Sequence, residues 1–423
     1  MSYLFSIFVD MFYHTILDER LSALGFGAMR LPLLPDGSVD RDTVFAMVDE
    51  AIAHGINYFD TAFPYHDGQS EQVLGAALNR YPRDKWNLAD KYPGHQHYDV
   101  FDPAGVFERQ LRRCGVDYFD FYLFHNICEN SIADYMDPRW GILDYFVKQR
   151  EEGRIRHLGF SCHSTPEHLQ TILDGPYGQV VEFVQIQLNY LDWSLQDARR
   201  KIEIIRDHGL PIVVMEPLRG GKLSHLSPAA HARLQELASS ETARSGGNSS
   251  EDGTTESTSS RTDTSWALRW LHDIPGLAVV LSGMSSLEQM KENIATFERP
   301  DPLSERERAV LAEIAEGMKD SVPCTACRYC CKGCPAELDI PALISEYNDL
   351  KVQVSLTPVM RLESLPEEKR PHACLKCGAC MQICPQGIAI PDILAELADM
   401  FDRAPKWADI CVQRNALSAK QNK

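Results

Sequence analysis

Basic residues are scarce in this chain of 423 residues. Lysine and arginine number 42 against 60 aspartates and glutamates, and the formal net charge is −18. A surface this acidic repels phosphate backbones and anionic lipid headgroups, so we expect no nucleic acid and no membrane among the partners. The same charge favours solubility but carries no information about the substrate.

Long apolar runs are also missing. Residues 1–17 are apolar, but no basic segment precedes them, Asp10 interrupts them and no A-x-A cleavage site follows. The segment therefore lacks the marks of a signal peptide and is too short for a membrane span. We expect residues 1–19 to form an N-terminal extension, disordered or packed on the surface, of a cytoplasmic protein.

The chain has no G-x-G-x-x-G after its first β-rich segment, which disfavours a doubly wound dinucleotide-binding sheet. What it has is a regular alternation of short apolar segments and amphipathic stretches. Strands are predicted at residues 24–31, 56–62, 86–92, 118–125, 155–161, 183–189, 211–217 and 278–284. Helices are predicted at 42–55, 70–81, 104–115, 142–153 and 197–209. This α/β pattern predicts a closed (β/α)8 TIM barrel over residues 20–318, with the doubly wound sheet as the alternative.

One segment interrupts the alternation. Residues 239–264 are rich in serine, threonine, glycine and charge and hold almost no apolar side chains. Such a segment cannot bury enough surface to offset its ordering entropy, so we expect a disordered insertion. It follows the seventh predicted strand, on the catalytic face of a barrel, where an inert insertion and a mobile flap are both conceivable.

Cysteines are not spread through the chain, which argues against a disulfide framework. Eight of the thirteen form two runs of the spacing C-x2-C-x2-C-x3-C-P, and Cys331 lies inside the first run. The runs consist of Cys324, Cys327, Cys330, Cys334 and of Cys374, Cys377, Cys380, Cys384. This is the spacing of bacterial ferredoxins, and it predicts two [4Fe–4S] clusters in a small, mainly helical, ferredoxin-like domain over residues 319–423.

In two-cluster ferredoxins the last cysteine of each run binds the other cluster. We therefore expect Cys334 to join the second run and Cys384 to join the first. Paired zinc sites are the alternative, although a tetrahedral zinc site has no use for a third cysteine two residues further on. Thiolate ligands require a reducing compartment. We expect the cysteines outside the runs to be packing residues: Cys114, Cys128, Cys162 and Cys411.

Four titratable side chains stand at the ends of three neighbouring predicted strands, where barrel enzymes place their chemistry. They are Asp60, Tyr65, Lys91 and His125. Tyr65 is a proton donor for a carbonyl oxygen that gains charge during reduction, and a nearby lysinium lowers the pKa of the phenol. Asp60 keeps Lys91 charged and oriented, and His125 donates a second hydrogen bond to the developing oxyanion.

The motif D-T-A-x-x-Y, with E-x-x-L-G at residues 71–75 and the lysine and histidine at strand ends, resembles the aldo-keto reductase superfamily. The resemblance extends over residues 20–318 and includes the segments 24–32, 158–163, 184–190, 266–270 and 279–293. The cysteine-rich tail resembles the bacterial subgroup of these reductases that carries a C-terminal Fe–S domain. The resemblance implies a catalytic tetrad of Asp60, Tyr65, Lys91 and His125.

The resemblance also implies binding of NADP(H) or NAD(H). The expected coenzyme contacts are Gly27, Met29, Ser161, Gln185, Leu218, Gly283, Ser285, Gln289 and Asn293. Cys162 stands where many members have asparagine, and Met215 and Glu216 stand where an aromatic residue usually stacks on the nicotinamide. No basic residue for a 2′-phosphate is evident in residues 281–286, so both coenzymes remain open.

These features predict an enzyme, namely an oxidoreductase that transfers hydride between NAD(P)H and a small-molecule carbonyl or alcohol. The clusters serve electron transfer or structure, and a redox partner protein is a further expected partner. Two alternatives stand beside this hypothesis: a cluster-driven electron-transfer enzyme, and a redox-sensing or regulatory barrel without turnover. A nicotinamide releases two electrons together whereas a cluster accepts one, so a direct transfer between them normally needs a mediator.

Overall fold

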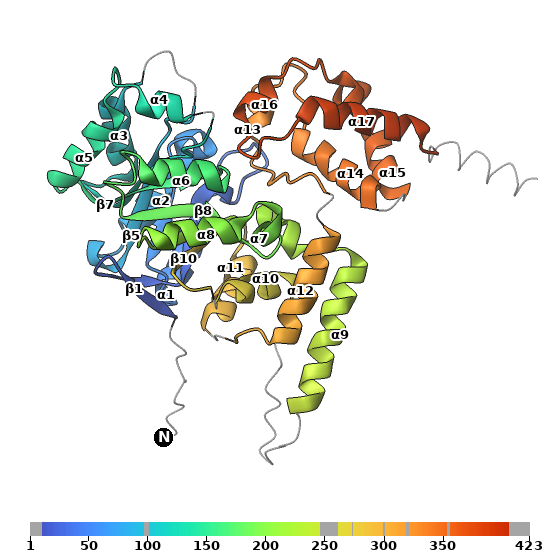
Figure 1. Ribbon diagram of the computed structural model, residues 1–423, viewed down its shortest axis with the longest axis horizontal. Helices are drawn as coiled ribbons and strands as arrows, with labels where there is room; N and C mark the ends of the chain where they lie inside the picture. Colours follow the sequence, from blue (N-terminus) through green and yellow to red (C-terminus); the bar gives the residue numbers. More distant parts are fainter. Residues whose placement is uncertain are drawn as a thin grey trace, which may run out of the picture. The chain divides into compact units, whose positions relative to one another are not determined.

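The computed structural model describes residues 11–96, 101–129, 131–245, 261–272, 274–298, 301–318, 321–352 and 356–405. The chain divides into two compact units, Met1–Gly317 and Met318–Lys423 (Figure 1). This division falls one residue before the domain boundary expected from the sequence. Cys411 lies outside the described residues.

The first unit is a closed barrel of eight parallel strands in the order β10-β3-β4-β5-β6-β7-β8-β9. The strands are β3 (Leu24–Gly27), β4 (Tyr58–Asp60), β5 (Asn87–Tyr92), β6 (Phe119–Phe124), β7 (Ile155–Cys162), β8 (Phe183–Gln187), β9 (Ile212–Met215) and β10 (Leu277–Ser282). Each overlaps one of the eight segments predicted from the sequence, although β7 and β10 each extend one residue beyond the predicted range. The predicted (β/α)8 barrel is confirmed, and the doubly wound sheet is excluded because β10 pairs with β3 and closes the ring.

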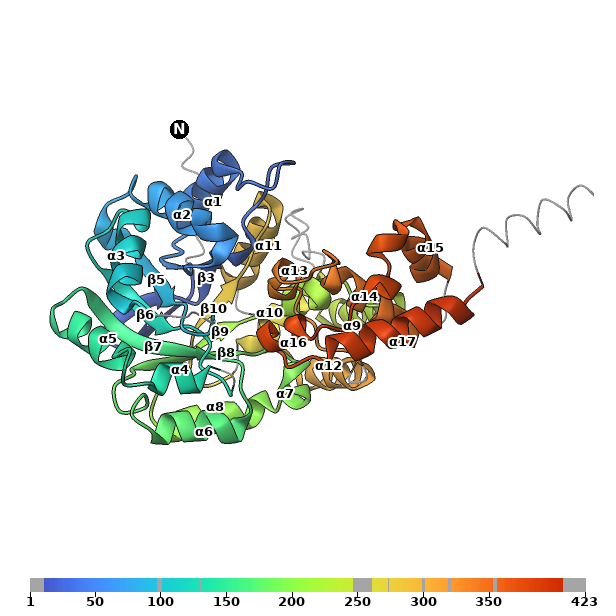
Figure 2. The ribbon, with the colours of Figure 1, turned by 90° about the horizontal axis from the view of Figure 1, so that it is seen from above.

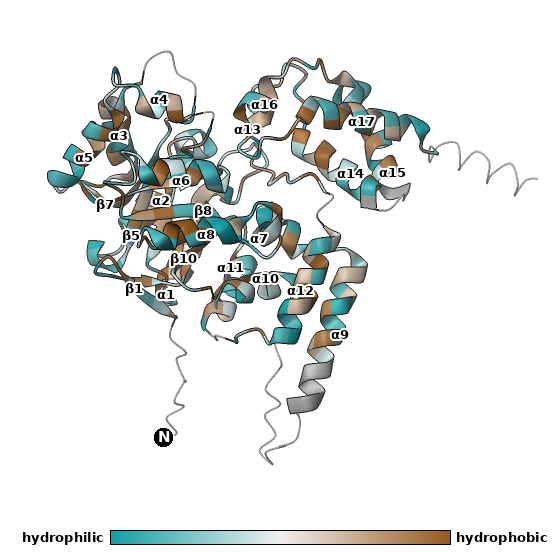
Figure 3. Ribbon diagram, in the orientation of Figure 1, coloured by the Kyte–Doolittle hydropathy of each residue, from teal (hydrophilic) through white to brown (hydrophobic). Residues whose placement is uncertain are grey.

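Helices surround the barrel strands, as Figure 2 shows. The α-helices of this unit are α1 (Arg41–Ala53), α2 (Gln69–Leu78), α3 (Pro103–Cys114), α4 (Ile132–Met136), α5 (Ile142–Glu151), α6 (Pro166–Asp174), α7 (Asp192–Leu195), α8 (Ala198–Asp207), α9 (Pro228–Ser245), α10 (Asp263–Leu271), α11 (Leu287–Glu298) and α12 (Glu305–Gly317). Short 3-10 turns are η1 (Ala28–Arg30), η2 (Tyr65–Gly68), η3 (Arg83–Lys85) and η4 (Arg219–Ser224). Figure 3 shows apolar residues along the strands and polar residues on much of the helices' outer surface.

Part of the expected N-terminal extension, residues 1–19, is a folded hairpin and not a disordered or surface-packed segment, while residues 1–10 lie outside the described part of the chain. Strands β1 (Tyr13–Ile16) and β2 (Glu19–Ser22) form an antiparallel hairpin, with Tyr13 opposite Ser22. Leu21 of this hairpin is fully buried in the barrel core, in contact with apolar side chains of β4–β6 and β8–β10. The hairpin therefore closes the amino-terminal end of the barrel, and the sequence pattern failed to reveal it because its strands are only four residues long.

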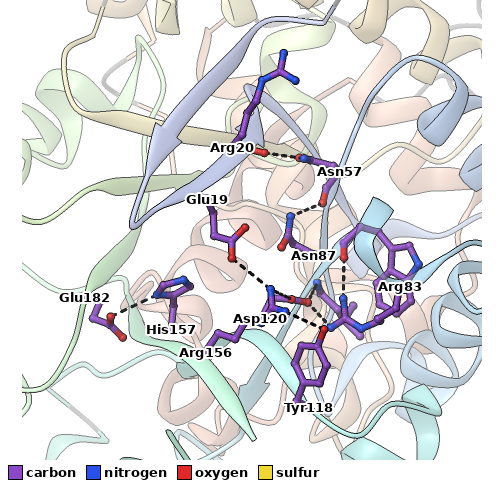
Figure 4. A network of polar contacts seen from close by, with 12 residues as sticks. Glu19, Arg20, Asn57, Arg83, Asn87, Tyr118, Asp120, Arg156, His157 and Glu182 are labelled. Carbon is purple, nitrogen blue, oxygen red and sulfur yellow. Dashed lines mark hydrogen bonds and ion pairs between the residues drawn. The ribbon is translucent and has the colours of Figure 1, made fainter. Parts of the chain in front are cut away.

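A polar network covers the same end of the barrel (Figure 4). Asp120, at the start of β6, accepts a hydrogen bond from Arg83 at 2.5 Å and forms an ion pair with Arg156 at 3.3 Å. Arg156 also reaches Glu19 of the hairpin at 3.3 Å and the Tyr118 hydroxyl at 3.2 Å. The buried carboxylate of Asp120 is thus matched by two guanidinium groups, and the hairpin is tied to the barrel.

Both ends of the segment predicted as a disordered insertion, residues 239–264, are helical instead. Helix α9 runs to Ser245 and so includes the first seven residues of that segment, and α10 begins at Asp263. The side chain of Thr262 caps α10 by accepting a hydrogen bond from the backbone N–H of Ser265 at 3.1 Å. The intervening residues 246–260 lie outside the described part of the chain.

The second unit contains helices and, within residues 321–352 and 356–405, no strand. Its elements are α13 (Tyr329–Lys332), α14 (Ile340–Val352), α15 (Leu356–Ser364), η5 (Glu367–Lys369), η6 (Pro371–Ala373), α16 (Ala379–Ile383) and α17 (Ile390–Arg403). Each cysteine run contains a short helix, α13 or α16, and is followed by a long helix that begins with Ile-Pro. The two long helices, α14 and α17, pack on one another around a small apolar core.

None of the helices in the described part of the chain is long and apolar enough to span a bilayer.

Candidate functional site

A buried ion pair lies at the carboxyl-terminal end of the barrel strands. Lys91, near the end of β5, donates hydrogen bonds from Nζ to Oδ1 of Asp60 at 2.5 Å and to the carbonyl oxygen of Thr61 at 2.7 Å. Lys91 is 0% and Asp60 3% exposed. Burial raises the pKa of Asp60, and the Lys91 ammonium opposes that rise. The second carboxylate oxygen of Asp60 is buried and receives no hydrogen bond from a described residue.

Tyr65 reaches this ion pair from the loop that follows β4. Its side chain is 8% exposed, and Nζ of Lys91 lies 5.0 Å from the centroid of its ring. The ring of His125, directly after β6, meets it edge-on with the centroids 5.9 Å apart. The loop turns sharply here, with positive φ at His66, whose Nε2 accepts the backbone N–H of Leu31 at 3.2 Å. The structure thus brings the four side chains of the predicted tetrad together.

His125 is held neutral. Burial lowers the pKa of His125 well below its usual range, and the neighbouring His95, Lys91 and His163 lower it further. Nδ1 of His125 is buried and has no hydrogen-bond partner among the described residues. The ring of His95 lies 4.3 Å from that of His125, a contact that was not predicted from the sequence. Nothing in the local pattern of residues 93–96 indicated this contact, since a loop and not a strand positions His95.

Two predicted coenzyme residues lie on adjacent strands, in register with each other. Ser161 of β7 pairs with Gln185 of β8. The Ser161 hydroxyl accepts the backbone N–H of Asn126 at 2.8 Å. Gln185 donates from Nε2 to the sulfur of Met215 at 3.6 Å, and its Oε1 is buried without a partner among the described residues. Cys162 is buried and accepts the backbone N–H of Ser164 at 3.3 Å.

A second buried ion pair, unpredicted from the sequence, stabilises the segment after β9. Arg219 follows the predicted residue Leu218 and pairs with Asp192, and both side chains are 0% exposed. Gln187 and Asn189 donate to the other oxygen of Asp192 at 2.7 and 2.6 Å. Arg219 itself has a positive φ, so the ion pair holds a strained turn after β9.

The opposite side of the mouth, around β3 and β10, contains further residues that were expected to contact the coenzyme. A Cβ added at Gly27 would come within 3.2 Å of the carbonyl oxygen of Ser282, and one at Gly283 within 3.4 Å of the side chain of Arg30. Met29 is half-buried. Arg30 is a basic residue whose side chain lies beside Gly283, and it was not predicted as a coenzyme contact because it follows β3 and not β10.

Side-chain hydrogen bonds order the loop after β10. The Ser285 backbone N–H donates to Oε1 of Gln289 at 2.8 Å, and the Ser285 hydroxyl donates to the carbonyl oxygen of Arg30 at 2.9 Å. Asn293 donates from Nδ2 to the Ser282 hydroxyl at 2.9 Å, while its Oδ1 is buried without a partner among the described residues. Helix α11 therefore carries a buried acceptor beside this loop that no described residue satisfies.

The second unit contains two small cavities, each lined by four cysteines. One is lined by Cys324, Cys327, Cys330 and Cys384, together with Ile344 and Ile388 among others. The other is lined by Cys334, Cys374, Cys377 and Cys380, together with Leu338 and Leu394 among others. The last cysteine of each run thus belongs to the cavity of the other run. Cys331 lines neither cavity.

Within the described residues, no three His, Cys, Asp or Glu side chains converge closely enough to ligate a single metal ion. A cubane cluster is larger than an ion, and its four ligands stand around a cavity instead of meeting at one point. No disulfide joins any two cysteines of the described residues.

Comparison with known proteins agrees with this division of the chain. Residues 23–316 match the profile of the Aldo/keto reductase family, and residues 323–389 match that of a 4Fe-4S dicluster domain. An NADH-specific methylglyoxal reductase of Escherichia coli is 25% identical over 71% of this chain and 97% of its own length. An L-galactose dehydrogenase of Arabidopsis thaliana is 28% identical over 70% of this chain and 90% of its own.

Solved structures resemble the barrel. The holo form of an aldo-keto reductase from Bacillus halodurans superimposes with a TM-score of 0.55 and 27% identity, covering 72% of this chain and 96% of its own. An aldo-keto reductase from Klebsiella pneumoniae, in complex with NADPH, shares the fold with a TM-score of 0.55 and 22% identity, covering the same shares of the two chains.

Proposed function

The chain belongs to the aldo/keto reductase family and is an oxidoreductase with a 4Fe-4S dicluster domain, and from this premise we propose that it transfers hydride between NAD(P)H and a small carbonyl or alcohol substrate. The observation that carries the proposal is the position of the Lys91 ammonium. It binds Asp60 on one side and lies 5.0 Å from the ring of Tyr65 on the other.

Tyr65 is the proton donor in this proposal. An ammonium has three N–H donors, and Asp60 and Thr61 take two of those on Lys91, which leaves one for the Tyr65 hydroxyl. That positive charge favours the phenolate and eases proton transfer to the carbonyl oxygen. His125, neutral in its buried position, donates an N–H to the same oxygen.

The coenzyme would supply the hydride, and the residues around the mouth fit its binding. Gln185 Oε1 and Asn293 Oδ1 are buried acceptors without donors among the described residues, and a carboxamide or an adenine amino group would satisfy them. Ser161, Gly27, Met29 and Leu218 would complete the nicotinamide side, and Gly283, Ser285 and Gln289 the adenosine side. Arg30 offers positive charge to a phosphate in either NADP(H) or NAD(H).

Two [4Fe–4S] clusters, one in each cysteine-lined cavity, form the second part of the proposal. Cys324, Cys327, Cys330 and Cys384 would hold one, and Cys334, Cys374, Cys377 and Cys380 the other. Three ligands of each cluster would come from one C-x2-C-x2-C run, because its short spacing directs three thiolates into one cavity. Such clusters need a reducing compartment, which the cytoplasm provides.

The test is reduction of a panel of carbonyl compounds by NADPH and NADH under anaerobic conditions. We expect Tyr65→Phe to lower kcat/KM by about 10²–10⁴-fold while the cluster absorbance is unchanged. Tyr145→Phe, on the surface-facing part of α5, is the matched control and should retain activity. Retained activity in Tyr65→Phe would contradict the assignment of the proton donor.

EPR spectra of the same samples address the clusters. A cluster signal after addition of NADPH would assign them to electron transfer with the barrel, and a signal with dithionite alone would assign them a structural or sensing role.

A further inference from the structure

A second polar cluster lies behind the strand that carries Lys91, between β5 and the helices α2 and α3. Arg113 of α3 donates to Oε2 of Glu71 at 2.6 Å, and Glu71 faces Asp90 of β5 within hydrogen-bonding reach. Both Glu71 and Asp90 are 0% exposed. Because side chains alternate along a strand, Asp90 points away from the barrel interior that Lys91 enters.

This cluster holds the main chain of Lys91 at both of its polar atoms. The backbone N–H of Lys91 donates to Oδ1 of Asp90 at 2.8 Å. The Lys91 carbonyl oxygen accepts from Nε2 of Gln110 at 3.1 Å, and Gln110 in turn accepts from the Tyr122 hydroxyl at 2.6 Å. The lysine is therefore fixed from outside the barrel at its backbone and from inside at its ammonium.

The charges of the cluster do not balance if both acids are ionised. Two buried carboxylates would share a single guanidinium, and neither could donate a hydrogen bond to the other. Oε1 of Glu71 makes no hydrogen bond of standard geometry with a described residue, and the nearby Gln110 amide donates to the Lys91 carbonyl oxygen instead. A proton on Asp90 removes one negative charge and supplies that missing donor.

The surroundings of Asp90 place the proton there rather than on Glu71. Burial and the Glu71 carboxylate raise the pKa of Asp90 well above its usual range, although the backbone N–H and the charge of Lys91 oppose them. Glu71 has Arg113 to stabilise its anion. The other titratable groups facing Asp90, Cys114 and Tyr122, both have a raised pKa and are neutral.

We propose that Asp90 and Glu71 share one proton, with Asp90 as the neutral donor, and that this acid pair is a positioning device for Lys91. The role of the lysine itself rests on the proposed function. The pair adds a single negative charge, matched by Arg113, and Asp60 remains the anion that pairs with the Lys91 ammonium.

The pH dependence of thermal unfolding tests whether Asp90 is protonated, and it requires no substrate. An acid whose pKa is raised in the folded state loses its proton on unfolding at higher pH, so its contribution to stability falls as pH rises. Asparagine copies the neutral acid: it accepts from Lys91 and donates to Glu71. We expect Asp90→Asn, with clusters loaded, to unfold at a higher temperature than the wild type at pH 8, with a smaller gap at pH 5.5. A lower unfolding temperature at pH 8 would mean that Asp90 is ionised.

Glu71→Gln makes the corresponding change at the other acid of the pair. It leaves Arg113 without its anion, so we expect a lower unfolding temperature than the wild type throughout the same pH range. If Glu71 held the proton instead, Glu71→Gln would be tolerated and Asp90→Asn would be destabilising. Infrared spectra give a separate readout, since the carbonyl band of a neutral carboxylic acid should be absent in Asp90→Asn.

Kinetics tests the positioning role. We expect Asp90→Ala to lower kcat by about tenfold with little change in KM, and Asp90→Asn to restore kcat. Loss in both variants, or in neither, would overturn the positioning role. The thermal and infrared results stand even if Tyr65→Phe proves active, so a failure of the proposed function is distinguishable from a failure of the acid pair.

Discussion

The barrel site and the cysteine-lined cavities differ in how their residues come together. Asp60, Tyr65, Lys91 and His125 are separated by up to 65 residues and meet only because parallel strands end at one edge of a closed sheet. Three of the four cysteines of each cavity are neighbours within seven residues. Long-range packing positions the first site, whereas local spacing positions most of the second.

The two sites also differ in what supports them. The barrel contains most of the buried apolar side chains among the described residues, and Lys91 is held at its backbone as well as its ammonium. The core of the second unit is small and includes Cys330 and Cys380 themselves. Replacing a cysteine that lines a cavity should therefore affect the structure of the second unit. Replacing a residue of the tetrad should affect activity first.

The largest expected effect is the loss of a cluster. Cys384→Ala should remove one of two clusters and leave about four iron atoms and four sulfides per chain, as measured by iron and labile-sulfide analysis of anaerobically purified protein. Cys331→Ala, a cysteine that lines neither cavity, is the matched control and should keep the full content.

Double variants test the exchange of the fourth ligand between the runs. Adding Cys324→Ala to Cys384→Ala should remove no further iron, because both residues line the same cavity. Adding Cys374→Ala instead should remove the remaining cluster. The reverse pattern would show that each run keeps its own fourth cysteine.

An intermediate effect is expected at the ion pair of the barrel. Lys91→Met should lower kcat/KM by about 10²–10⁴-fold and destabilise the barrel by about 3 kcal/mol, because Asp60 is left buried without its cation. Asp60→Asn in the same chain should recover much of the stability but not the activity. Steady-state kinetics and thermal unfolding followed by circular dichroism separate the two. Recovery of activity in the double variant would contradict a role for the ammonium.

The smallest expected effect concerns the charge of His125. Because burial lowers its pKa, the unfolded chain binds a proton at this residue below about pH 6.5 that the folded barrel excludes. Stability should therefore fall as pH drops through that value, and less so in His125→Asn. The measurement is the difference in unfolding temperature between the two proteins at pH 7.5 and 5.5. The pKa of His163 is also lowered, to about 4, but this residue contributes equally to the pH dependence of stability in the wild type and in His125→Asn. Equal slopes would contradict a neutral, buried His125.

Much of the fold was predictable because apolar periodicity reflects burial directly. All eight barrel strands lie where alternating apolar segments predicted them, and the family assignment is confirmed. The hairpin at Tyr13–Ser22 was missed because two four-residue strands leave no periodic signal, and its burial depends on Leu21 meeting a core built by distant strands. The continuation of α9 to Ser245 was missed because polar composition outweighed helical propensity in the argument.

The amino-acid sequence by itself determined the repeating βα pattern, the identity of the chemical groups and the two cysteine runs, since each is a local property of residue type and spacing. Only the tertiary structure decided the contacts that the sequence did not predict: His95 with His125, Arg30 with Gly283, and Arg219 with Asp192. The physical reason is that such contacts join loops that no periodic pattern marks. Their existence depends on how the barrel closes and brings these loops together, which no local pattern encodes.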